Sequence, residues 1–259
     1  MAEAATLTLP TPRLPTRRDE AWRYADMDGV ARLGVAALDQ WQAIDVPAGT
    51  SVTRCMIVGS SQPELHRFRV TLGEGATAAF FVTNRGGDYT RVELEVHLAK
   101  GAHFEFGGVT IGGGTATREF VTQVTHAEPD ATSNQTIRAV HWNTGTGNFL
   151  GEIKVARHAQ KTDAAQDFKA LLLEAGASAN AVPQLEIFAD DVKCAHGATV
   201  GELDESARFY MMARGLDPAT VQRLLVQAFI GDAFVALDDE VEHEKLLDAA
   251  LSALEGARL

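Results

Sequence analysis

The chain has 259 residues, of which 46% are hydrophobic, and its formal net charge is −12. This size is sufficient for one large domain, and the acidic balance argues against nucleic-acid or anionic-membrane binding, which both require basic patches. No apolar run approaches the roughly 20 residues that span a bilayer, and the first 20 residues lack the apolar core of a secretory signal. With only two cysteines, the composition predicts a cytoplasmic protein with reduced thiols.

Residues 1–50 are predicted to contain a disordered start and a short helical segment. The first 15 residues are rich in Pro, Thr and Ala, a composition typical of poor order. A helical pattern then begins at Thr16, where either Thr16 or Asp19 can serve as the N-cap. Gly29 and Gly34 fall within this pattern, so we expect the helix to be short or broken.

Residues 51–203 are predicted to form a β core. Partial period-two alternation, with β-branched and aromatic enrichment, extends from about Val52 to Phe188. The segments with this pattern are 66–72, 78–84, 91–98, 103–111, 119–127, 135–142 and 151–158.

A small-residue pair recurs beside these segments and indicates how they are connected. The pairs are Gly75-Ala76, Gly101-Ala102, Asp130-Ala131, Gly176-Ala177 and Gly197-Ala198. A unit of about 20–30 residues with a tight corner is typical of a stacked solenoid, because glycine permits the turn and alanine allows close stacking. The repeat favours a β-helix, while a β-sandwich with Greek-key connections stays open on this evidence.

Residues 204–259 change to a helical pattern. Asp204 is a suitable N-cap for a first helix that ends near Gly215, and Asp217-Pro218 opens a second helix. A last acidic helix follows. These helices could cover the open end of the solenoid or could present an apolar surface to a partner.

Cys194 and His196 form the most distinctive candidate site. No phosphate-binding P-loop, nucleophile elbow or HExxH motif is present in the sequence. Cys194 and His196 are two positions apart on a predicted strand and therefore share a face, as a metal half-site or a reactive thiol with its base would. A small buried cysteine beside a hydrogen-bonded histidine is the inert alternative. His103 and Glu105 form a second same-face pair, as in a cupin-like metal site.

Three segments resemble the SufB/SufD family of iron–sulfur cluster assembly scaffolds, in its SufD branch. The first is LPTRRDEAWRYADMDGV at residues 14–30, which is similar to an N-terminal motif of that branch. The second is the run at residues 145–187. The third is LEIFADDVKCAHGATVGELDESARFYMMARGL at residues 185–216.

The resemblance implies a right-handed parallel β-helix with flanking helices, paired with SufB as a heterodimer. It also implies that the C-terminal helices dock SufC, an ABC-type ATPase, so that ATP hydrolysis belongs to the partner and this chain is not an enzyme. The candidate docking residues are Phe209, Leu216, Leu224, Leu225 and Phe229.

The resemblance further implies a site shared with SufB. His196 would face a SufB cysteine in the family's K-C-x-H-G-A-T motif, with Cys194 beside it. The cargo would be a transient iron–sulfur cluster or iron, and none would be held stably by the chain alone. A homodimer in isolation is also expected from exposed strand edges. The region between the N-terminal motif and the β core is shorter than the family usually has. The competing hypothesis is a cupin-like or β-helix metalloenzyme that uses His103, Glu105 and His196.

Overall fold

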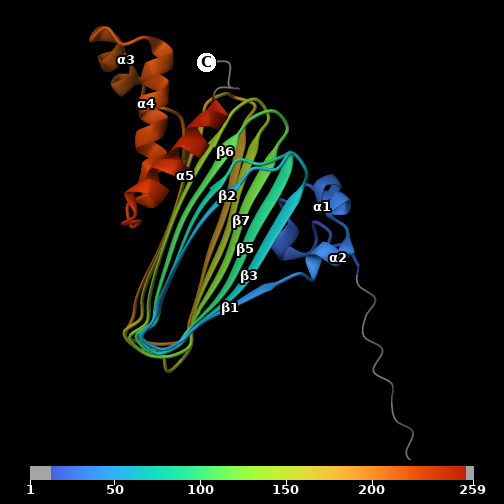
Figure 1. Ribbon diagram of the computed structural model, residues 1–259, viewed down its shortest axis with the longest axis vertical. Coiled ribbons are helices and arrows are strands. Elements are labelled where there is room, and N and C mark those ends of the chain that lie inside the picture. Colours follow the sequence, from blue (N-terminus) through green and yellow to red (C-terminus); the bar gives the residue numbers. More distant parts are fainter. Residues whose placement is uncertain (1–12, 255–259) are drawn as a thin grey trace, which may run out of the picture.

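The computed structural model describes residues 13–254, and it is a parallel β-solenoid with helices attached to both outer faces (Figure 1). A short N-terminal segment contains η1 (Glu20–Trp22), α1 (Met27–Leu33) and α2 (Val35–Leu38). The C-terminal segment contains α3 (Glu205–Ala213), α4 (Pro218–Gly231), η2 (Asp232–Phe234) and α5 (Glu240–Ala253). Among the described residues, no helix combines the length and apolarity that crossing a membrane requires.

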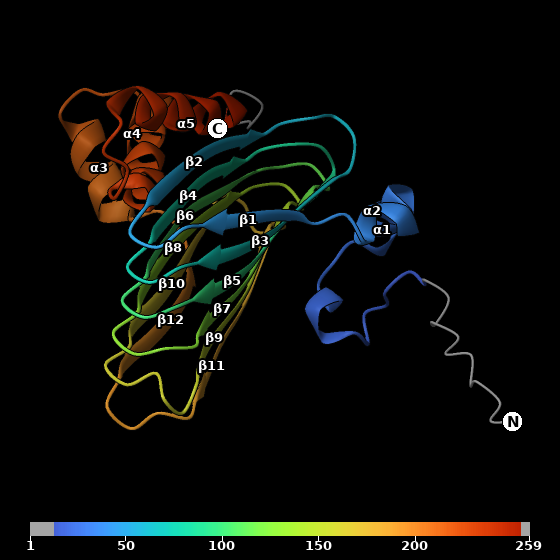
Figure 2. The same cartoon turned by 60° about the horizontal axis from the view of Figure 1, so that its bottom comes forward.

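The described residues form twelve strands that alternate between two six-stranded parallel sheets, so each coil of the solenoid contributes one strand to each sheet. Sheet I has the order β1-β3-β5-β7-β9-β11, and sheet II has the order β2-β4-β6-β8-β10-β12 (Figure 2). The strands are β1 (Gln42–Val46), β2 (Ser51–Val58), β3 (Glu64–Leu72), β4 (Thr77–Asn84), β5 (Tyr89–Leu98), β6 (His103–Gly112), β7 (Thr117–His126), β8 (Thr132–His141), β9 (Thr146–Val155), β10 (Asp163–Leu172), β11 (Ser178–Ile187) and β12 (Lys193–Gly201). The predicted parallel β-helix is confirmed, and the sandwich alternative is wrong.

A column of left-handed residues forms one edge of the solenoid. Gly75 and Gly101 both have φ of 63°, Asp130 has φ of 62° and Lys161 has φ of 60°. Each donates its backbone N–H to a carbonyl of the next corner, as Gly75 does to Lys100 at 2.8 Å. The alanines that follow the first three corners are fully buried, so they stack as the sequence predicted.

Two of the predicted corners lie elsewhere in the structure than the sequence pattern suggested. Gly176-Ala177 lies at the opposite edge of the solenoid, and Gly197-Ala198 lies inside β12. The expected corner at Gly197 is therefore wrong. The corner that precedes β10 is at Lys161, and lysine rarely adopts a positive φ.

The solenoid interior is a stack of phenylalanines between the sheets. Phe80 lies 5.7 Å from Phe68 and 6.2 Å from Phe104 between ring centroids, and further along Phe149 stacks on Phe168 at 5.8 Å. These side chains come from inward-facing alternate positions and are at most 1% exposed. The alternation noted in the sequence therefore places one face of every strand in this core.

The outer faces are covered at one place each. α4, η2 and α5 pack on sheet II, where Phe234, Ile230 and Leu246 meet outward residues such as Phe81 and Val109. The N-terminal segment packs on sheet I, where α1 contributes Val30 to a cluster around the outward Tyr89.

The disordered start predicted for the first 15 residues lies mostly outside the described residues. The predicted helix signals on either side of the β core are matched in part. The helix expected from Thr16 is broken into η1, α1 and α2, because Asp26 caps a new start and Gly34 has φ of 77°. The first strand is β1 at Gln42–Val46, earlier than the strand expected near Val52. At the other end, Asp204 and Asp217 cap α3 and α4 as expected.

Candidate functional site

Cys194 and His196 lie on β12, the last strand of sheet II. Within residues 13–254, β12 pairs only with β10, in a register that sets Cys194 beside Ala164 and His196 beside Gln166. β11 is the matching last strand of sheet I and, among the described strands, pairs only with β9. The last coil therefore presents two strand edges with unpaired backbone groups at the same end of the solenoid.

Cys194 faces the solenoid interior. It is half-buried and packs with Ile153, Val155 and Ala164. Burial, with a contribution from Asp163, raises the pKa of the Cys194 thiol. The thiol is therefore protonated at neutral pH, and a positive charge or a metal brought to this coil would be required to form the thiolate.

His196 shares the inward face of β12 with Cys194, but its side chain is exposed because no further coil of the described chain covers it. Beneath it lies Gln166, whose Nε2 donates to the carbonyl of Gln184 on β11 at 3.1 Å. Within residues 13–254, no group of three His, Cys, Asp or Glu side chains is arranged to hold a metal ion. An imidazole and a thiol suit iron or zinc, so this pair can supply only part of a coordination shell.

The second candidate pair lies elsewhere. His103 and Glu105 are on the outer face of β6, with His103 Nε2 3.6 Å from a Glu105 carboxylate oxygen. His103 Nδ1 contacts the Thr132 hydroxyl at 2.7 Å. His196 is on the opposite face of sheet II, three strands away. The geometry does not bring the three residues of the metalloenzyme hypothesis into one site.

The predicted docking residues divide between exposed and packed positions. Phe209 is 75% exposed, and Leu216 and Leu224 are 39% and 40% exposed. Leu225 is half-buried, whereas Phe229 packs on the sheet II cluster. α3 has no buried residue and stands away from the solenoid (Figure 1). This helix and the adjoining face of α4 form an apolar surface that nothing in residues 13–254 covers.

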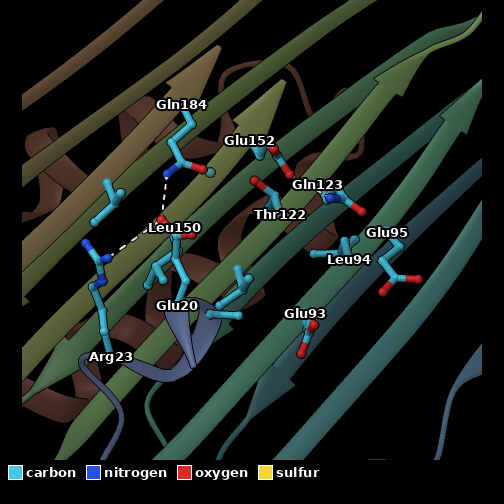
Figure 3. Close-up of a pocket in the computed structure, with 14 residues that line it drawn as sticks. Glu20, Arg23, Glu93, Leu94, Glu95, Thr122, Gln123, Leu150, Glu152 and Gln184 are labelled. Carbon is cyan, nitrogen blue, oxygen red and sulfur yellow. Dashed lines mark hydrogen bonds and ion pairs between the residues drawn. The ribbon is translucent and has the colours of Figure 1, made fainter. Parts of the chain in front are cut away.

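A groove of about 310 Å³ on sheet I is separate from these features (Figure 3). Its floor includes Leu150 and its walls include Glu20, Arg23 and Glu152. The polar groups bond to one another, since Gln123 Nε2 donates to Glu152 at 2.6 Å and Glu20 lies 3.6 Å from Arg23. The residues that line the groove include four glutamates and Arg23 but neither His nor Cys.

The structure also explains the N-terminal motif. Trp22 lies over the guanidinium of Arg91 at 3.9 Å, and Arg91 Nη1 donates to the carbonyl of Ala21 at 2.7 Å. Arg91 is fully buried between Glu93 and Glu119. The motif therefore attaches the N-terminal segment to sheet I through Arg91. Sequence reasoning missed it because the partner is about 70 residues away.

Comparison with known proteins identifies relatives of this chain. A family model described as "SUF system FeS cluster assembly, SufBD core domain" matches residues 35–229. The iron–sulfur cluster assembly protein SufD of Escherichia coli is 38% identical over 126 residues, which are 49% of this chain and 30% of that protein. SufD of Bacillus subtilis is 28% identical over 159 residues, 61% of this chain and 34% of the relative.

A plastid relative matches a shorter segment. "Protein ABCI7, chloroplastic" of Arabidopsis thaliana is 45% identical over 87 residues, which cover 34% of this chain and 18% of that protein. The chain thus spans about a third or less of the length of these three relatives.

Proposed function

The chain belongs to the SufB/SufD family, in its SufD branch, and from this membership we propose that it acts as a non-catalytic scaffold subunit in iron–sulfur cluster assembly. The observation that carries the proposal is the open last coil, in which an exposed His196 and a half-buried Cys194 lie at a free strand edge. A scaffold requires an incomplete site of this kind, because the cluster must be built there and then released.

The proposed partner at this coil is SufB. The unpaired edges of β11 and β12 offer backbone groups to strands of a similar solenoid, and pairing would cover the inward face that His196 occupies. SufB would then supply the remaining ligands for a transient cluster or iron, which is the cargo of the complex. The same edges would pair two copies of this chain in the absence of SufB.

The proposed partner at the helices is SufC. The exposed Phe209, Leu216 and Leu224 support an apolar contact, while Leu225 and Phe229 would stabilise the docking helix from below. ATP hydrolysis is assigned to SufC, since this sequence has no P-loop. The cytoplasm is the compartment that we propose.

The test is a substitution at His196 in the assembled complex. The chain is coexpressed with a SufB and a SufC of the same source, as wild type, as His196→Ala and as Thr199→Ala. Thr199 is an exposed residue of β12 on its opposite face, so it controls for disturbance of the strand. We expect all three complexes to assemble.

The readout is the iron and sulfide content after cluster formation in the cell. His196→Ala should reduce it at least tenfold, and Thr199→Ala should leave it unchanged. Equal cluster content in His196→Ala and wild type would refute the role of His196. Failure of the wild-type chain to bind SufB would refute the scaffold proposal itself.

A further inference from the structure

Five polar side chains gather inside the solenoid at the edge opposite the Gly75 column. The ladder register places Thr90 beside Arg118 in sheet I and Asn84 beside Thr110 in sheet II. His141 lies next to Thr110, with its Nε2 3.1 Å from the Thr110 hydroxyl. Arg118 is 6% exposed and the other four are at most 1% exposed. The cluster adjoins the apolar part of the interior, which contains the phenylalanine stack together with Val, Leu and Ala side chains.

The cluster has donors without acceptors. Arg118 Nη2 donates to the carbonyls of Arg85 and Gly87, at 3.2 Å each. Its Nε and Nη1 have no hydrogen-bond partner among the described residues. The Asn84 Oδ1 accepts from Thr90 at 2.6 Å, but Asn84 Nδ2 is also without a partner in residues 13–254. All three buried, unpaired groups are N–H donors, which call for an acceptor.

The cluster also has a positive charge without a counter-charge. Glu119, the sequence neighbour of Arg118, accepts from Tyr89 on the outer face at 2.8 Å. Asp88 is directed to Arg32, at 2.6 Å. Burial lowers the pKa of Arg118 to about 10, so the guanidinium is still protonated at neutral pH. An uncompensated buried charge costs several kcal/mol.

His141 does not add to this charge. Burial, and then the proximity of Arg118, lower its pKa to about 3, so the imidazole is neutral. Its Nδ1 donates to the carbonyl of Gly112 at 2.9 Å, and its Nε2 therefore accepts from Thr110. The net charge of the cluster is that of one guanidinium.

Two glycines make room for the cluster. A Cβ at Gly112 would lie 2.7 Å from Arg118 Nη2, and a Cβ at Gly147 would lie 2.6 Å from His141 Cδ2. Larger residues at these positions would displace the guanidinium and the imidazole. Because these side chains already approach the backbone so closely, an acceptor that enters must be small.

We propose that the Arg118–Asn84 cluster binds one small monovalent inorganic anion, of the size of chloride, inside the solenoid. The anion accepts from Arg118 and from Asn84 Nδ2, and thereby joins sheet I to sheet II at this edge. It is a structural counter-ion, and it is independent of the proposed role of His196.

The experiment measures unfolding of the full chain in sodium chloride and in sodium isethionate at equal ionic strength, because isethionate is too large to enter. We expect chloride to raise the unfolding midpoint progressively with its concentration. Asn84→Asp should remove this dependence, since the new carboxylate neutralises Arg118 in place of the anion. Arg118→Met should remove it as well.

Arg138→Met is the matched control, because Arg138 is equally buried but already has two carboxylate partners. It should keep the chloride dependence. Crystals soaked in sodium bromide should show an anomalous peak beside Arg118. Equal midpoints in the two salts together with no bromide peak would overturn the proposal, as would a chloride effect that persists in Asn84→Asp. The bromide and salt measurements on wild type decide the matter if a variant does not fold.

Discussion

Gly107 of β6 lies directly against the backbone of η2, and Gly107→Ala should loosen the C-terminal helices. An added Cβ would overlap the carbonyl oxygen of Ala233 in η2 and would lie 2.7 Å from Cδ1 of Phe81. Ordinary contact begins at 3.4 Å, so η2 must retreat by more than about 1 Å. Overpacking of this size costs about 1–3 kcal/mol of unfolding free energy.

The assay is urea unfolding combined with amide hydrogen exchange of α4 and α5. Exchange in these helices should accelerate more than exchange in β3–β9, because the strain is confined to the helix–sheet contact. Gly201→Ala is the control, since an added Cβ there meets no atom within 4 Å in the described residues. A Gly107→Ala protein with wild-type stability and exchange would refute the idea that this contact positions the helices.

Three further substitutions or conditions test the packing. Trp22→Ala should lower the free energy of unfolding, measured in urea, by about 2 kcal/mol, because it removes the ring over the buried Arg91. An unchanged free energy of unfolding would show that other contacts hold the N-terminal segment on sheet I. Asp232→Asn should lower the free energy of unfolding by only about 1 kcal/mol, since Asp232 is 52% exposed although it contacts the buried Arg138. Amide exchange in η2 as slow as in the wild type would contradict this expectation. Acidification should unfold the protein steeply. Burial lowers the pKa of His126 to about 4 and that of His141 to about 3, so the unfolded state binds more protons below pH 6.5. Stability should therefore fall by up to about 1.4 kcal/mol per histidine for each pH unit lost, and His126→Gln should roughly halve this slope in urea titrations between pH 6.5 and pH 4.

The solenoid could be predicted from sequence because its corners leave a local signal. Gly75, Gly101 and Asp130 are residue types that accept positive φ, and each precedes a buried alanine. Lys161 performs the same turn with a residue type that gives no such signal. The Gly197-Ala198 pair has the right composition but lies within a strand, so composition alone could not distinguish a corner from a strand interior.

The candidate site could be placed only in part. Period-two alternation correctly puts Cys194 and His196 on one face of β12. Their different burial could not be predicted, since it depends on β12 being the last strand of its sheet. The separation of His103 from His196 could not be predicted either, because the order of the strands in sheet II and the face that each residue occupies are set by the whole solenoid.

The buried arginines show most clearly what sequence could not reveal. Arg91 and Arg138 each hold a terminal segment on an outer face, through contacts to residues 70 and 94 positions away. Both are neutralised by two carboxylates. Arg118 is buried to a similar degree, yet its hydrogen bonds within residues 13–254 go only to backbone carbonyls. An uncompensated buried charge costs several kcal/mol, which is a large share of the roughly 5–15 kcal/mol that typically stabilises a folded protein. The difference between Arg118 and the other two arginines is therefore the reason to search for an anion there first.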